Sequence, residues 1–560
     1  MIIIHCTIIF TSGYSQENGH LNISFSSAKL SLNETSLISV LMDGCLNGSI
    51  RKTFKRLRTK VTCGLMEFGY FVSLKKEGMD NDMGTESRIW SLHGTMETPR
   101  RGLPHVLVVG AGMAGLVTAR LLKDTGFAVV VLEARDRVGR RIWTDYTFGV
   151  PCDLGASWIH GAKNNPLASW CRTIGIELII SPRGSICFYD SGHCRRLLEL
   201  LWQARRGITH AGIALARSYM AVRMRKLLGH HGDISVEVAL RSVLANPRIR
   251  PFDKRVLSWL VAMVEAVNGA PADLLNLLEM EPEELRKTNV IPAGGYDELI
   301  RDAARGLDIR LNTEVKRIAY GTEGVVAITK KETFSADLAV VAVPLGVLKS
   351  GDLQFDPPLS AEKRAAIDRI GFGGRAVLNK IALLFPYRFW PVESEKITTL
   401  PVDLEQRGGF EYWVDLESVT GAPILVGFAS GSIAAAWDLE APDEQICQQA
   451  HRVLQRMFSS QIPEPQAYRV TRWLSTPFSR GSYSYSAVGS NASDRKCLAE
   501  PVAGRLFFTG EATHQTRYAT VDGALLAGER EALRIHRRYC CTHEKKESLP
   551  WYRASHRWMR

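Results

Sequence analysis

The chain has 560 residues, of which 45% are hydrophobic and 23% are charged. This composition is typical of globular proteins and excludes a disordered or collagen-like chain, while the length predicts two or three domains around a large core. The net charge of +12 does not indicate nucleic-acid binding, because residues 537–560 alone hold seven basic side chains against two acidic ones.

The sequence contains no run of about 18 apolar residues, which a membrane-spanning helix would need. Its apolar first residues lack the basic flank of a signal peptide. Eleven cysteines without a C-x-x-C pair are typical of a reducing compartment, and the adjacent Cys540 and Cys541 have no partner at metal-binding spacing. We therefore expect a soluble, cytoplasmic protein without a metal, a membrane or a nucleic-acid partner; the oligomeric state stays open.

Residues 1–95 are rich in Ser, Asn and Gly and show no sustained hydrophobic period, so they predict no fold. Met96 is followed within a few residues by the first strand of a nucleotide-binding pattern. Our hypothesis is that Met96 is the biological start. The preceding segment is then a leader, a disordered tail or an extension foreign to the native protein.

A strand, a glycine turn, a helix and a second strand follow from His105. Buried parallel strands are predicted by the apolar, β-branched runs at 105–109 and 127–132, with a helix over 116–125 between them. Gly110, Gly112 and Gly115 form G-x-G-x-x-G, which lets a pyrophosphate approach the backbone at a helix N-terminus. Glu133 ends the second strand, where a carboxylate accepts from both ribose hydroxyls and disfavours a 2′-phosphate. The pattern predicts NAD or FAD rather than NADP.

The remaining sequence alternates between helical and strand-like regions. Residues 176–290 are mostly helical in pattern and include a basic amphipathic stretch over 195–226. Strand-like runs return at 309–318, 325–328 and 338–344, and the chain ends with a strand at 505–510 and a long Ala/Leu/Gly-rich helix. Strands that return this late predict an α/β nucleotide-binding domain assembled from discontinuous segments, with a second domain between them.

Five further motifs occur in order: GluAlaArgAspArgValGlyArgArg at 133–141, AspLeuGlyAlaSerTrpIleHisGly at 153–161, ValAlaValProLeuGlyValLeuLys at 341–349, SerArgGlySerTyrSerTyr at 479–485 and PhePheThrGlyGluAlaThr at 507–513. With them the chain resembles, over about residues 104–536, the flavin-containing amine oxidases, which comprise polyamine oxidases, monoamine oxidases and lysine-specific histone demethylases. The closest resemblance is to spermine and acetylpolyamine oxidases.

The resemblance implies a fold and domain boundaries. It implies a Rossmann-like FAD-binding domain of the GR2/amine-oxidase type and an α+β substrate-binding domain. The first would comprise residues 101–175, 290–355 and 496–536, and the second residues 176–289 and 356–495. Residues 1–95 would be an N-terminal extension and 537–560 a basic tail.

The resemblance also implies which residues hold FAD. Glu133 and Arg135 would bind the adenosine and diphosphate, Arg141 the diphosphate, and Glu511 the ribityl chain. Ser482 stands where members with a covalent flavin have a cysteine, so we predict non-covalent FAD. The complete predicted set is Gly110, Ala111, Gly112, Met113, Ala114, Gly115, Glu133, Ala134, Arg135, Arg141, Gly155, Ala156, Ser157, Trp158, Val315, Gly510, Glu511, Thr520 and Val521.

One position departs from the family pattern. The family's Gly-Gly-Arg is Gly139-Arg140-Arg141 here. An arginine at this position either obstructs the close approach of the phosphates or adds a charge-assisted hydrogen bond to them. FAD affinity, not the fold, depends on which of the two holds.

Lys380 and His160 are the predicted catalytic residues. Lys380 lies in a strand-like apolar run, where burial would lower its pKa; in the family this lysine bridges through water to flavin N5, and we expect it to assist flavin reoxidation or amine deprotonation. The alternative is a lysine that reaches solvent from a strand edge. His160 would accept a hydrogen bond from a substrate nitrogen, or would only bond a backbone carbonyl.

The substrate slot is predicted from aromatic and small residues. Tyr483 would form one wall beside the flavin and guide the amine by its ring face. Thr520 stands where monoamine oxidases have a second tyrosine, so the slot would be open on that side and suit a secondary or bulky amine. Tyr518 would partly close it or pack in the core, and Trp473 is open to the same two interpretations.

The sequence therefore predicts an FAD-dependent amine oxidase. A small amine, most favourably a polyamine, would be oxidised to an imine that hydrolyses to an aldehyde, and O2 would be reduced to hydrogen peroxide. The alternatives are a lysine-specific demethylase, a monoamine or amino-acid oxidase, and a non-catalytic flavoprotein in which Arg140 impairs FAD binding.

Overall fold

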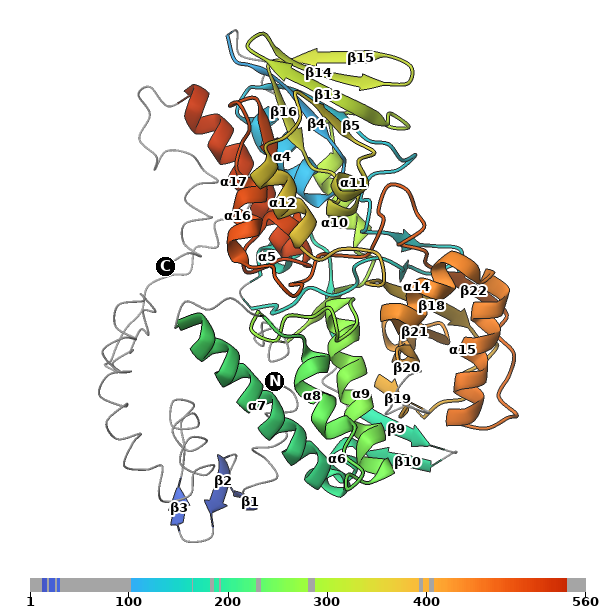
Figure 1. The fold of residues 1–560 in the computed structure, drawn as a ribbon. Helices are drawn as coiled ribbons and strands as arrows, with labels where there is room; N and C mark the ends of the chain where they lie inside the picture. The colour runs from blue at the N-terminus through green and yellow to red at the C-terminus, as the bar shows by residue number, and fades with distance from the viewer. Residues whose placement is uncertain are drawn as a thin grey trace, which may run out of the picture. The chain divides into compact units, whose positions relative to one another are not determined.

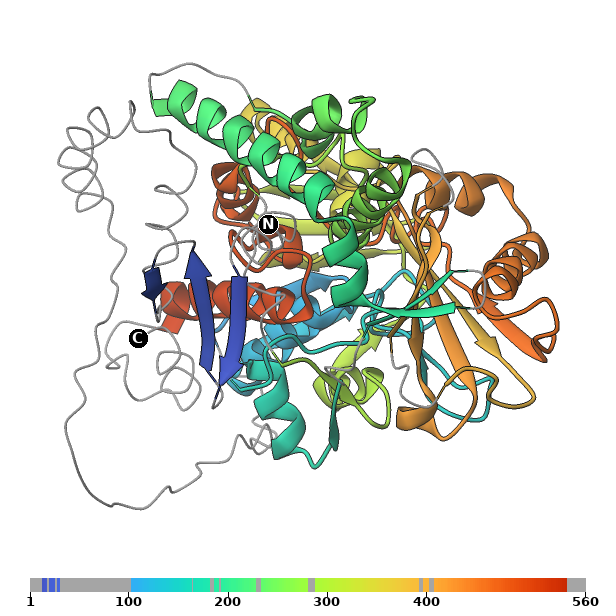
Figure 2. The ribbon, with the colours of Figure 1, turned by 90° about the horizontal axis from the view of Figure 1, so that it is seen from below.

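The computed structural model describes residues 13–17, 20–25, 28–30, 102–163, 165–181, 186–190, 193–227, 233–279, 288–391, 396–401 and 407–540. The chain separates into two compact units, residues 2–89 and residues 90–560. In the first unit β1 (Gly13–Glu17), β2 (His20–Phe25) and β3 (Ala28–Leu30) form an antiparallel sheet (Figure 2). The sequence analysis expected no strand there; the hypothesis that the chain starts at Met96 stays a prediction.

A five-stranded parallel sheet organises the second unit (Figure 1). The strands at 105–109, 338–341 and 506–508 are buried along almost their whole length, which explains their apolar sequences, whereas the edge strand at 308–310 exposes Asp308 and Arg310. They come from three distant parts of the chain, in the order β12 (Asp308–Arg310), β5 (Ala128–Leu132), β4 (His105–Val109), β16 (Leu338–Val341) and β23 (Leu506–Phe508). The α/β fold class and the predicted strand–helix–strand unit are confirmed.

Helices cover this sheet. The glycine turn leads into α4 (Met113–Asp124), and α17 (Val521–Cys540) packs along it, with α10 (Asp297–Ala304) beside α4. The approach of α4 and α17 is close, since the Thr118 hydroxyl donates to the Gly528 carbonyl at 3.0 Å. The helix α17 includes residues 537–540, which the sequence analysis had assigned to the tail.

A four-stranded sheet adjoins the parallel one. It consists, in order, of β15 (Thr333–Ala336), β14 (Gly324–Thr329), β13 (Val315–Gly321) and β17 (Gln354–Asp356). The single strand-like run predicted at 309–318 is thus wrong in its extent, because a turn divides it between β12 and β13. The short helix α11 (Leu345–Ser350) follows β16.

A seven-stranded sheet forms the other part of the unit. Its strands, in order, are β10 (His193–Arg196), β9 (Ile186–Asp190), β19 (Lys396–Thr398), β20 (Gly409–Asp415), β21 (Ile424–Ser430), β18 (Leu378–Leu384) and β22 (Ala467–Val470). The helices α14 (Gly431–Glu440) and α15 (Asp443–Met457) pack against it around a core that includes Trp413 and Phe385.

The region predicted as helical contains α6 (Leu197–Gln203), α7 (Arg205–Leu227), α8 (Val236–Leu244) and α9 (Pro251–Asn268). The prediction missed β8 (Leu178–Ile180), β9 and β10 there; β10, with the sequence HisCysArgArg, has no apolar alternation to reveal it. The remaining elements are β6 (Thr144–Asp145), β7 (Cys152–Asp153), α5 (Pro166–Thr173), β11 (Val290–Pro292), α12 (Ala361–Arg369), α13 (Glu417–Thr420), α16 (Ala492–Ala499) and the 3₁₀ helix η2 (Glu511–Thr513).

The strands of the parallel sheet fall in the segments predicted for the cofactor domain, and those of the seven-stranded sheet in the segments predicted for the substrate domain. Residues 90–560 nevertheless form one compact unit, so the boundary between two domains stays a prediction. Among the described helices, none has both the length and the apolar character needed to cross a membrane.

Close packing at the glycine turn gives a first prediction. A Cβ atom on Gly115 would lie 2.0 Å from the carbonyl oxygen of Gly110, whereas a Cβ on Gly321, at the exposed end of β13, would meet nothing within 4 Å. We expect Gly115→Ala to lower the free energy of unfolding by about 1–3 kcal/mol and Gly321→Ala to change it by less than about 0.5 kcal/mol. Urea denaturation measures both; equal effects would contradict the packing described here.

Candidate active site

The site begins at the glycine turn between β4 and α4. Glu133 directly follows β5 and is fully buried, yet its carboxylate accepts two backbone N–H groups, from Ala111 at 2.7 Å and from Arg135 at 3.0 Å. Burial opposes ionisation, but the Arg140 guanidinium and these hydrogen bonds hold the pKa of Glu133 below its ordinary value. A charged carboxylate therefore faces the turn, as the sequence predicts for a ribose-binding acid.

Arg140 fills the space above the glycines. Its Nε donates to Glu133 Oε2, the oxygen that also accepts from the Ala111 N–H, at 2.9 Å, and its side chain is only 8% exposed. Built Cβ atoms show how close it lies: one on Gly110 would be 3.0 Å from the Arg140 Cζ, and one on Gly112 would be 3.1 Å from its Cδ. The sequence left open whether Arg140 obstructs the phosphates or bonds them. In the structure its side chain lies in the space over Gly110 and Gly112, which we call the glycine cradle.

Arg141 connects this region to the segments that contain Ser482 and Glu511. Its guanidinium donates to Glu511 Oε1 at 3.0 Å and to the Ser482 carbonyl at 2.9 Å. Glu511 also accepts from the Ser484 hydroxyl at 2.6 Å and from the Ala519 N–H at 2.8 Å. Burial raises the pKa of Glu511, but the guanidinium and these donors outweigh it and leave the pKa lowered. Glu511 thus ties together three segments around the predicted flavin position.

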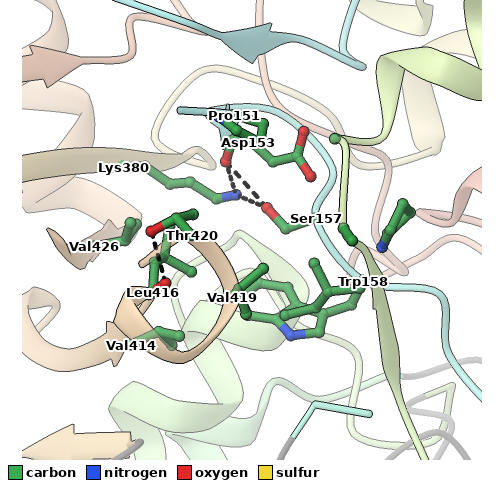
Figure 3. Close-up of a pocket in the computed structure, with 14 residues that line it drawn as sticks. Pro151, Asp153, Ser157, Trp158, Lys380, Val414, Leu416, Val419, Thr420 and Val426 are labelled. Carbon is green, nitrogen blue, oxygen red and sulfur yellow. Dashed lines mark hydrogen bonds between the residues drawn. The ribbon is translucent and has the colours of Figure 1, made fainter. Parts of the chain in front are cut away.

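Lys380 on β18 completes the site (Figure 3). Its buried ammonium donates to the carbonyls of Asp153 at 3.0 Å and Gly155 at 2.6 Å and to the Ser157 hydroxyl at 2.6 Å. Burial is the main cause that lowers the pKa of Lys380 to about 8. The alternative of a solvent-facing lysine is excluded. All three N–H donors have protein acceptors, so a water-bridged contact to the flavin needs one of these bonds to be shared or broken.

A cavity opens beside Lys380 and Ser157 (Figure 3). The Trp158 indole forms part of its wall and donates to the Ser181 hydroxyl at 3.2 Å. Apolar side chains close the other side: Val414, Leu416, Val419 and Val426. Asp153 also lines the cavity; its carboxyl accepts from the Thr144 hydroxyl at 2.6 Å and from the Tyr296 N–H at 3.1 Å, and burial raises its pKa to about 6. The cavity therefore combines an apolar lining with two buried titratable residues, Lys380 and Asp153.

The predicted slot residues have fixed positions. The Tyr483 hydroxyl donates to carbonyls at the end of α9, at 2.9 Å to Ala266 and 3.2 Å to Val267. The Thr520 hydroxyl accepts from the Gly523 N–H at 3.0 Å, so it caps α17. The Tyr518 ring lies 3.8 Å from the Arg495 guanidinium carbon, and its hydroxyl bonds Ser486. Thr520 and Tyr518 thus have structural partners in addition to their predicted roles.

The other predicted residues divide between the site and the core. His160 is half-buried; within the described residues its imidazole has no hydrogen-bond partner, and its carbonyl accepts from Asn165 at 2.8 Å. Trp473 is 6% exposed and packs in the core of the seven-stranded sheet, edge-on to Trp143. Val315 is buried at the start of β13, and Val521 begins α17.

Sequence reasoning missed two residues of the site. Arg495, on α16, is buried and donates to the Ser484 hydroxyl at 2.8 Å and to the Ala512 carbonyl at 3.2 Å. Its second terminal nitrogen is buried and has no hydrogen-bond partner in the described part of the chain. Ser484 lies inside a motif that was recognised for Tyr483, but nothing in the helical sequence around Arg495 distinguishes it from a surface arginine.

These contacts lie in sequence from Glu133 and Arg140 to Arg141, whose guanidinium bonds Glu511 and whose carbonyl accepts from the Ala156 N–H at 3.1 Å, next to the Gly155 carbonyl that binds Lys380. This arrangement suits an extended dinucleotide. A glycine turn at a helix N-terminus, a charged buried acid and an arginine at the junction are the groups that hold such a cofactor. The donor set fits FAD on one condition. The Arg140 side chain, which is flexible and lies in the glycine cradle, has to move aside.

Comparisons with known proteins decide the family. Residues 113–536 match the model for flavin-containing amine oxidoreductases. The chain belongs to this family. It is 37% identical over 456 residues to Polyamine oxidase 2 of Arabidopsis thaliana, which covers 78% of this chain and 89% of that protein. It is 35% identical over 464 residues to Lysine-specific histone demethylase 1 homolog 1 of Oryza sativa subsp. japonica, but spans only 52% of its length.

Solved structures show the same fold. Putrescine oxidase bound to putrescine superimposes with a TM-score of 0.62 at 21% identity, over 77% of this chain and 99% of that one. Cyclohexylamine oxidase from Brevibacterium oxydans gives 0.62 at 20% identity, over 78% and 99%. The predicted family, the amine-oxidase fold and the flavin cofactor, FAD, are therefore confirmed, whereas the roles of individual residues stay predictions.

The buried lysine gives a second prediction. Between its folded pKa of about 8 and its ordinary value of 10.5, Lys380 is protonated in the unfolded chain but neutral in the folded one, so raising the pH favours folding. From pH 7.5 to 9.5 this should add about 1–2 kcal/mol to the wild-type free energy of unfolding relative to Lys380→Met. Urea denaturation at both pH values tests it; parallel profiles would contradict it.

Proposed function

We propose that the chain is an FAD-dependent amine oxidase that acts on polyamines and passes the electrons to O2. The observation that carries the proposal is the buried lysine beside Ser157 and Trp158, at the predicted flavin face, within a chain of this family. Polyamine specificity is supported by the Polyamine oxidase 2 relative and by the imidazole of His160, which has no hydrogen-bond partner among the residues that the structure describes. FAD, when bound, supplies the acceptor for hydride from the carbon next to the amine nitrogen.

The chain's own residues would bind and deprotonate the amine. A hydride donor amine has to be neutral, and the Lys380 ammonium, with its pKa near 8 and its bond to the Ser157 hydroxyl, is placed to exchange a proton at the buried end of the site. Tyr483, held by carbonyls at the end of α9, presents a fixed ring toward the substrate. The overall balance is amine, O2 and water to aldehyde, released amine and hydrogen peroxide.

A demethylase acting on a modified lysine is the second candidate. It is supported by identities of 34–35% to plant lysine-specific demethylase homologues. The chain spans about half the length of these relatives (52–58%), against 89% of Polyamine oxidase 2, and this difference favours the smaller substrate.

Anaerobic reduction of the flavin tests the proposal. We expect spermine, spermidine or an N-acetylated polyamine to bleach the visible spectrum of the FAD-loaded full chain, and O2 to restore it with one hydrogen peroxide per turnover. A monoamine and a methylated-lysine peptide are the comparison substrates. Bleaching by the peptide alone would favour the demethylase, and a flavoprotein that none of these compounds reduces would contradict amine oxidation.

His160 gives a prediction on specificity. If its imidazole bonds a nitrogen of a polyamine, His160→Ala should raise the KM for spermine about tenfold, as the loss of one hydrogen bond to a charged group predicts, and leave the KM of a monoamine unchanged. His210→Ala, on the exposed side of α7, is the matched control. Steady-state kinetics measure both; an equal loss for the two substrates would argue against a specificity role.

A further inference from the structure

Arg140 lies where the family pattern has a glycine, and its backbone keeps a glycine-like conformation. Its φ of +55° is in the left-handed region, which costs a side-chain-bearing residue about 1 kcal/mol or more. We propose that Arg140 is a cofactor gate: its side chain occupies the cradle that the ribose and diphosphate of FAD need, and it must leave Glu133 before the cofactor can bind tightly.

Hydrogen bonds hold the backbone around Arg140 in place. The gate therefore opens by rotation of the Arg140 side chain. The Gly139 N–H donates to the Ala111 carbonyl at 2.8 Å, which fastens this loop to the glycine turn. Arg137 donates to the Arg140 carbonyl at 2.8 Å and to the Ile142 carbonyl at 3.2 Å. The loop therefore cannot swing away from the glycines without losing these hydrogen bonds.

Arg140 and the ribose compete for one carboxylate. The Glu133 oxygen that accepts from Ala111 also accepts from the Arg140 Nε, and the carboxylate has no exposed surface from which another donor could approach. A second bond, from the Arg140 guanidinium to the Ala342 carbonyl at 3.3 Å, holds the side chain across the turn. A ribose hydroxyl can reach Glu133 only when this side chain has rotated away.

The gate has a measurable consequence for affinity. The apparent dissociation constant equals the intrinsic one divided by the fraction of molecules that are open. If the buried ion pair keeps nine molecules in ten or more closed, removing Arg140 should tighten binding about tenfold or more. The effect should be confined to ligands that contain the adenosine ribose and the diphosphate.

The test measures ligand binding to the flavin-free full chain by flavin fluorescence or calorimetry. The variants are Arg140→Gly, Arg140→Gln and the control Arg452→Ala, an exposed arginine on α15. We expect the dissociation constants of FAD and ADP-ribose to fall about tenfold or more in both Arg140 variants relative to wild type. The dissociation constant of FMN should not change in these variants, and Arg452→Ala should leave all three constants unchanged. Arg140→Gln keeps a long side chain and serves if the glycine variant folds poorly.

Two outcomes with the variants, and a third with the wild type, would overturn the gate. Equal FAD affinity in wild type and variants would mean that Arg140 does not compete, and weaker binding in the variants would mean that it turns to bind the diphosphate. A wild-type readout needs no variant: the observed rate of FAD association should level off as FAD increases, and a rate that stays linear would contradict a closed ground state. All of these readouts are independent of amine oxidation, so they separate this inference from the proposed function.

Discussion

The structure depends on how one buried charge is compensated. Glu133 directly follows a strand of the parallel sheet and has no solvent exposure, and an unpaired carboxylate in that position would be strongly unfavourable. Two backbone N–H groups and Arg140 stabilise it. The acid needed for the cofactor is therefore satisfied within the protein, and cofactor binding becomes an exchange of partners at this carboxylate. That exchange links the stability of the cofactor-free protein to its affinity for FAD.

The parts of the unit built on the two sheets meet through polar contacts and through apolar packing, since Cys152 and Leu154 share a buried cluster with Val426 and Phe428 of the seven-stranded sheet. Arg141 extends from the cofactor side to the Ser482 carbonyl, and Lys380 extends from the seven-stranded sheet to the Asp153 and Gly155 carbonyls. A change on one side therefore alters hydrogen bonding on the other. Lys380 is held by carbonyl and hydroxyl groups of residues 153–157, and residues 155–158 of the same segment are predicted to line the flavin.

Local patterns were the predictable part of the fold and site. The β4–α4–β5 unit could be predicted because its apolar runs and its three glycines all lie within one short stretch of sequence, His105–Leu132. The acceptors of Lys380 do not follow, because they are 223–227 residues away in sequence. Capping of α17 by Thr520 and the core position of Trp473 also depend on tertiary packing. The position of Arg140 over the glycines required the left-handed backbone, which no periodicity reveals.

Hydrogen exchange of the full chain with and without FAD, followed by mass spectrometry, tests the central claim that one continuous site extends from Glu133 to Lys380. The account predicts slower exchange on FAD binding in four separate segments, 110–115, 139–142, 153–158 and 511–521, together with the Lys380 strand. Protection limited to the segments around Lys380, with residues 110–115 and 139–142 unchanged, would contradict it, because the cofactor would then not occupy the glycine cradle.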